Sequence, residues 1–162
     1  MRATRLVCAV GLLLTGLCWS AQAQPATQVV TFQVLPINVI SFTGVPVVLT
    51  ITTAVAGLNP TTRTVSTARW NVTTNQTGAK ITASIPTNVP AGVTLSVNLA
   101  APTGATSLGY KALSTVSTDL VTGITKRNQT NRTVNYRLAA TAAAGVVPSQ
   151  TRVITYTITG GS

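Results

Sequence analysis

The stretch VTLSVNL, residues 93–99, is the clearest structural signal in the chain. Apolar side chains stand at its odd-numbered positions, and Thr, Ser and Asn stand between them. A β-strand sends successive side chains to opposite faces of a sheet, so this alternation predicts a strand with one buried and one polar face. A parallel strand buried on both faces would instead be a continuous apolar run. The stretch therefore indicates an antiparallel sheet.

The same alternation recurs along the chain and predicts about eight strands. The composition agrees, because residues 24–162 contain 29 threonines and are rich in Val and Ile, which suit a half-buried pleated surface. Glycines and prolines stand between the segments, Gly123 among them, and mark turns. The predicted strands are residues 27–35, 47–53, 64–73, 80–85, 93–99, 112–116, 132–140 and 151–159.

Helix signals are scarce. The Ala-rich residues 138–144 are the one candidate, and Gly145 and Pro148 follow at once, so we expect a strand end and a loop there. Short strands without helices predict an all-β fold, namely a single antiparallel β-sandwich with immunoglobulin-like or Greek-key topology. The 162 residues are enough for one domain with a core and few for two.

The N-terminus has the features of a secretory signal peptide. Arg2 and Arg5 precede an apolar run over residues 6–17, and the small-x-small pattern AQA follows at residues 21–23. We therefore assign residues 1–23 to a signal peptide. The apolar run is short for a transmembrane helix and no second one follows, so we expect no integral membrane span after signal removal.

Cysteine placement bears on the remaining chain, residues 24–162, which we expect to form the single sandwich domain. Cys8 and Cys18 both lie in the predicted signal peptide, so no disulfide can stabilise the exported domain. A lipidated Cys18 is the alternative, but lipoprotein processing requires a small residue where Leu17 stands.

The residue types exclude most catalytic chemistry. The chain has no histidine, and Asp119 is its one carboxylate side chain. A Ser-His-Asp triad, a Cys-His pair, a carboxylate pair and the usual metal-ligand sets all need residues that are absent. We therefore expect no enzyme activity, no metal and no cofactor. We interpret Asp119 as a turn residue paired loosely with a nearby Lys or Arg.

The charge balance is strongly basic. Removal of the signal lowers the formal charge from +10 to +8, and Arg127 and Arg132 belong to a basic cluster within residues 126–137. Such charge suits an anionic surface polymer as partner, but we prefer the simpler interpretation of a solvated basic face. Aromatic residues for base stacking are few, so we expect no nucleic-acid binding. We interpret Trp70, the one Trp after the signal, as a core residue rather than a sugar platform.

The layout of the whole chain resembles a known group of proteins. A signal peptide precedes an N-terminal strand at residues 27–35, a Thr- and Val-rich body, and a closing strand RVITYTIT at residues 152–159. This order resembles small bacterial secreted β-sandwich proteins of the fimbrial-subunit and spore-coat-U type. The resemblance implies a structural subunit or adhesive surface protein with immunoglobulin-like topology. It implies no catalytic residue.

Residues 27–35 suggest how such a subunit would assemble. They carry no charged side chain, and Val30, Phe32 and Val34 alternate with polar residues. An edge strand of this kind can add to the sheet of another copy, so we name these three residues, with Arg127 and Arg132, as candidate partner-binding residues. Pairing of residues 27–35 within their own sheet is the competing interpretation.

The sequence therefore predicts an exported, non-catalytic structural or adhesive protein, such as a fimbrial or extracellular-matrix-like subunit. We expect it to be secreted and located outside the cell or at the cell surface, with the periplasm as the other compartment. The alternative is a secreted binding module for a glycan or anionic polymer, monomeric, with an exposed groove that contains Trp70 or Tyr110. Self-assembly would distinguish the two.

Processing gives a direct test of the signal peptide. We expect cleavage between Ala23 and Gln24, because the small-x-small pattern ends there. Intact-mass measurement of the exported protein should show a chain that starts at Gln24, as glutamine or pyroglutamate. A mass that retains residues 1–23, or a diacylglycerol adduct on Cys18, would contradict this expectation.

Overall fold

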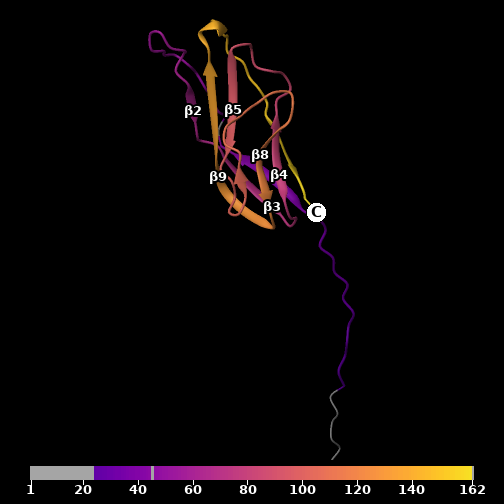
Figure 1. The fold of residues 1–162 in the computed structure, drawn as a ribbon. Helices are drawn as coiled ribbons and strands as arrows, with labels where there is room; N and C mark the ends of the chain where they lie inside the picture. Colours follow the sequence, from indigo (N-terminus) through magenta and orange to yellow (C-terminus); the bar gives the residue numbers. More distant parts are fainter. Residues whose placement is uncertain (1–23, 45, 162) are drawn as a thin grey trace, which may run out of the picture. The chain divides into compact units, whose positions relative to one another are not determined.

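The structure is a computed structural model that describes residues 24–44 and 46–161. It is an all-β fold in which two antiparallel sheets pack together as a sandwich (Figure 1). The predicted fold class is confirmed. The one helical element among the described residues is a single 3₁₀ turn, η1 (Ala142–Ala144), within the Ala-rich segment where a loop was predicted.

Ten strands form the two sheets in the described part of the chain. The larger sheet runs in the spatial order β1 (Asn38–Thr43), β3 (Arg69–Thr74), β9 (Arg127–Ala140), β5 (Val93–Leu99) and β7 (Lys111–Ala112), and β2 (Arg63–Val65) also pairs with β9. The smaller sheet runs in the order β10 (Thr155–Thr159), β4 (Ala79–Ser84), β8 (Thr118–Ile124) and β6 (Thr106–Ser107).

The strand β5 has the bounds that its alternation predicted. Val97 and Leu99 are fully buried, and Leu95 is half-buried on the same face. Thr94 lies exposed on the other face, but Ser96 is only 3% exposed. Ser96 has strand neighbours on both sides, since β7 and β9 both pair with β5 at this position. The alternation therefore identified the core face correctly and overestimated the exposure of the polar face.

The core lies between the two sheets and is built from apolar residues of both. Trp70 of β3 is completely buried, which confirms its interpretation as a core residue. The turn that precedes β5 requires a glycine at residue 92. Gly92 has φ +75°, and a Cβ there would lie 2.8 Å from Thr141 Oγ1. The largest fully buried side chains are Trp70, Ile81, Leu99, Leu120, Ile124, Val72, Val97, Val121 and Val134.

Two predicted strands are absent, and that part of the prediction was wrong. Residues 27–35 and 47–53 both alternate as expected, yet neither pairs with a strand in the described chain. A strand needs a partner for its backbone N–H and C=O groups as well as an alternating pattern. These two segments thus have the alternating side chains of a strand without backbone hydrogen bonds to a partner strand.

Other boundaries differ where backbone geometry interrupts the pattern. The predicted segment 64–73 divides into β2 and β3, because residues 66–68 leave the ladder. The predicted strands 112–116 and 151–159 shorten to β7 and β10. The sequence pattern missed β1, β6 and β8. The composition predicts a turn at Gly123, but this residue lies inside β8 with φ +75°, where the register with β4 is irregular.

Truncation of Leu99 tests this core against a matched site on the same strand. Leu99 is completely buried, so Leu99→Ala should lower the free energy of unfolding by about 2–5 kcal/mol. Leu95 is half-buried on the same face, so Leu95→Ala should cost less than about 2 kcal/mol. Urea unfolding of both variants gives the comparison. Equal losses, or a larger loss at Leu95, would mean that the strand is packed differently.

Candidate assembly surface

The N-terminal arm, residues 24–34, contains no strand or helix. Its candidate residues Val30, Phe32 and Val34 are 72%, 89% and 75% exposed. Residues 24–33 make no hydrogen bond with one another. Three large apolar side chains thus alternate with polar ones along an extended segment, a pattern that suits addition to a sheet edge.

The sandwich itself contains two extended segments without pairing, residues 46–52 and 146–154, which we call the open segments. No backbone–backbone hydrogen bond involves either one within the described residues. Val47, Leu49 and Ile154 are nevertheless half-buried, and they pack against the core. The open segments thus have the side-chain burial of strands and the free backbone groups of a sheet edge, which can accept another strand.

Both open segments adjoin one seam between the sheets. The first follows β1 and the second precedes β10, and these are edge strands of the larger and smaller sheet. Phe42 of β1 stacks on Tyr156 of β10, with ring centroids 4.0 Å apart. Aromatic stacking of this kind joins the two edges that lead into the open segments.

A buried tyrosine pair closes the same seam. The hydroxyl groups of Tyr136 and Tyr156 lie 3.0 Å apart and share a hydrogen bond. Burial raises the pKa of Tyr136, and burial together with the Tyr136 hydroxyl raises the pKa of Tyr156. Both phenols therefore keep their protons in the folded protein to a higher pH than an exposed tyrosine does.

The candidate cations Arg127 and Arg132 both lie on β9 and are half-buried. The Arg132 guanidinium donates a hydrogen bond to the Ala101 carbonyl, and the Arg127 guanidinium lies close to Gly104. The structure therefore brings these two arginines against the loop at residues 100–105. It does not unite them with Val30, Phe32 and Val34 in one site.

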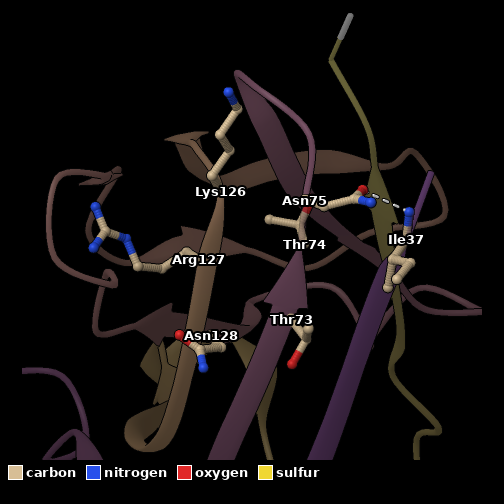
Figure 2. Close-up of a pocket in the computed structure, with 7 residues that line it drawn as sticks. All are labelled: Ile37, Thr73, Thr74, Asn75, Lys126, Arg127 and Asn128. Atoms are coloured by element: carbon tan, nitrogen blue, oxygen red, sulfur yellow. Dashed lines mark hydrogen bonds between the residues drawn. The ribbon is translucent and has the colours of Figure 1, made fainter. Parts of the chain in front are cut away.

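One end of the sandwich has a shallow depression of about 400 Å³ (Figure 2). Lys126 and Asn128 line it from the start of β9, and Ile37 and Asn75 line it from the other side. Lys126 adopts φ +42° at the turn into β9, and its backbone N–H donates to the Gln76 carbonyl. Asn75 is not recognisable from the sequence, because nothing in its local sequence reveals which backbone groups it meets.

Asp119 is paired, as expected, with a lysine: Lys80 Nζ lies 3.1 Å from its carboxylate, and both side chains are partly exposed. It lies within β8, however, and not in a turn. The other eight Lys and Arg side chains of the described chain have no carboxylate partner. Several arginines instead donate to backbone carbonyls: Arg69 to Ser66 and Ala68, Arg152 to Thr87 and Asn88, and Arg132 to Ala101.

Residues 24–44 and 46–161 contain no group of three or more His, Cys, Asp or Glu side chains that could hold a metal ion. None of the helical segments among these residues has the length and apolar character to cross a membrane. Comparisons of the chain with protein-family models, with curated proteins and with solved structures gave no match.

Alkaline titration tests the tyrosine pair. The folded pKa values lie above that of an unfolded tyrosine, about 10, so the pair stabilises the fold fully below pH 10. This contribution is lost as the pH rises further, since the unfolded chain loses its phenol protons first. Replacing both by Phe removes donor and acceptor together, so Y136F/Y156F should change stability at pH 7 by less than about 1 kcal/mol. Urea unfolding above pH 10 should show that Y136F/Y156F loses less stability with rising pH than the wild type does. An equal loss of stability would contradict the raised pKa values of the tyrosine pair.

Proposed function

We propose that this protein is an exported, non-catalytic structural subunit that assembles by strand addition. The N-terminal arm of one copy pairs with an open segment of the next. The observation that carries the proposal is the exposure of Val30, Phe32 and Val34, at 72–89%, in a chain whose sandwich also leaves strand-like segments unpaired. The location that fits this role is extracellular or the cell surface, as the signal-like N-terminus indicates.

The chemistry of the two partners is complementary. Residues 27–34 contain no proline and no charge, so every backbone N–H and C=O is free to join a ladder. Their even-numbered face presents Val30, Phe32 and Val34, while Thr31 and Gln33 suit the opposite, solvated face. Backbone pairing would supply affinity, and the three apolar side chains would supply register.

The geometry of such a contact favours open-ended polymers of many copies over closed dimers. The arm and the open segments are different surfaces, so each copy would use one to donate and the other to accept. A head-to-tail contact of this kind repeats without closing unless its rotation happens to complete a ring. A fibre-forming structural subunit, as the fimbrial-like resemblance implies, is the function that such repetition serves.

A second function has its own supporting observation. Eight cations without a carboxylate partner leave the described chain strongly positive, which suits an anionic surface polymer. Trp70 is completely buried, so it does not line the exposed groove that such a module would need. Tyr110 is half-buried, and the Arg137 guanidinium lies 4.2 Å from the centre of its ring. The positive charge is thus the observation that supports a binding module for a glycan or polyanion. Such a module is expected to be a monomer.

Removal of the arm tests assembly directly. The chain from Gln24 should form a ladder of multimers, and deletion of residues 24–34 should abolish it, because the donor is gone. A synthetic peptide of residues 24–34 should then bind the truncated protein. Size-exclusion chromatography with light scattering and negative-stain microscopy measure assembly, and peptide binding can be followed by fluorescence anisotropy.

Two charge substitutions separate the apolar face of the arm from its polar face. Phe32→Asp should reduce multimers by roughly tenfold or more, because a carboxylate would be buried without a partner. Thr31→Asp adds the same charge on the opposite face and should reduce them far less. If the full chain forms no multimers, or the truncated chain forms as many, strand addition fails and the polyanion-binding module is favoured.

A further inference from the structure

The base of the arm is held by one side chain, Asn75. The Ile37 backbone N–H donates to Asn75 Oδ1 at 2.7 Å (Figure 2). On its other side, Asn75 Nδ2 donates to the Leu35 carbonyl at 2.8 Å. The backbone N–H of Asn75 also donates to the Ile37 carbonyl at 3.3 Å. Three hydrogen bonds thus connect the residue after β3 with the two residues that flank Pro36.

The carboxamide of Asn75 acts here as an additional peptide group. The regular ladder between β1 and β3 ends at the pair Asn38 and Thr74. A carboxamide carries one carbonyl acceptor and an N–H donor, the same pair of groups that a backbone rung uses. The Asn75 side chain therefore extends the hydrogen bonding between β1 and β3 beyond the last ladder pair, as far as Leu35. Pro36 lacks an N–H, so the flanking groups of Leu35 and Ile37 are the ones that remain to be held.

Neighbouring side chains hold the backbone around Asn75 in place. The Thr74 hydroxyl donates to Asn38 Oδ1 at 2.7 Å and accepts from the Gln76 backbone N–H at 3.1 Å. Asn38 Nδ2 donates to Gln76 Oε1 at 3.0 Å. Thr74 is only 3% exposed, so its part of this network is shielded from water. Asn75 is thereby presented to Leu35 and Ile37 from a fixed position.

The hydrogen bonding ends abruptly at this point. Within residues 34–44 and 46–161, Leu35 is the first residue whose backbone makes a hydrogen bond, and residues 24–33 make none with one another. The Asn75 side chain therefore determines where the free arm begins. Without it, the first restraint would be the bond that the Ile37 carbonyl accepts, and the free segment would extend through Leu35 and Pro36.

We propose that Asn75 is a positioning residue for assembly, a role that rests on the proposed function of strand addition. Its partner is the segment at the base of the arm, where it binds Leu35 and Ile37 of its own chain, and through the arm it acts on the next copy. A shorter and firmly based arm loses less conformational freedom on docking. The residue does not contact the docked copy in this scheme.

The test compares Asn75→Ala with Asn128→Ala. Asn128 is an exposed amide that lines the same depression and makes no side-chain hydrogen bond in the described chain, so it is a matched control. In the chain from Gln24, Asn75→Ala should reduce the rate of multimer formation roughly tenfold, through the loss of two hydrogen bonds. Asn128→Ala should leave it unchanged. Asn75→Asp keeps the acceptor and loses the donor, and its rate should fall between wild type and Asn75→Ala.

Two further readouts separate positioning from general destabilisation. Amide hydrogen exchange at Ile37 should accelerate roughly tenfold in Asn75→Ala, with exchange in β5 and β9 unchanged. The truncated protein that lacks residues 24–34 should bind the arm peptide equally well with and without the Asn75→Ala substitution, because the acceptor is intact. Reduced peptide binding or a general rise in exchange would instead indicate structural damage and overturn the positioning role.

The outcomes distinguish this inference from the proposed function. If the wild type assembles and Asn75→Ala assembles at the same rate, strand addition stands and the role of Asn75 is wrong. Unchanged exchange at Ile37 would overturn it as well. If the wild-type chain never forms multimers, the proposed function fails, and the assembly role of Asn75 fails with it.

Discussion

Backbone pairing along β9 is the interaction on which the rest of the sandwich depends. Its 14 residues pair with β2 and β3 on one side and with β5 on the other. Residues 24–162 contain no cysteine, so no covalent bridge supports these ladders. Stability must come from hydrogen-bonded strands and the apolar core that they enclose. Any segment without a partner strand is therefore a conspicuous exception in this protein, and the arm and both open segments are such exceptions.

The scarcity of acids shapes how the cations are used. One carboxylate can neutralise one lysine, and an exposed pair such as Lys80–Asp119 contributes little to stability. The arginines instead donate to backbone carbonyls at loops and strand ends. Arg127 and Arg132, selected from the sequence for partner binding, lie against such a loop. Their charge still contributes to the field of the molecule, although part of their hydrogen-bonding capacity is directed inward.

Alternation predicted which face a segment would bury, and it could not predict whether a partner strand exists. Residues 93–99 and 47–53 have the same pattern, yet β5 pairs with a strand on each side and residues 47–53 pair with no strand in the described chain. Gly123 has the composition of a turn, yet an irregular strand tolerates its φ of +75°, which composition alone does not reveal. The exposed apolar face of the arm was predictable from its alternating residues. Asn75 was not, since its contacts with Leu35 and Ile37 exist only once β1 lies beside β3.

The unpaired segments are of two kinds, and the difference has a physical meaning. The arm exposes its apolar side chains as well as its backbone, whereas residues 46–52 bury alternate side chains and leave only the backbone unpaired. The arm lacks a core for its apolar side chains, whereas residues 46–52 lack a neighbouring strand for their backbone groups. Pairing between copies would complete both, because the arm would gain apolar burial and the edge would gain hydrogen bonds. Pairing of two arms, or of two edges, would satisfy only one of these needs, which is why the assembly that we propose uses a directional contact between arm and edge.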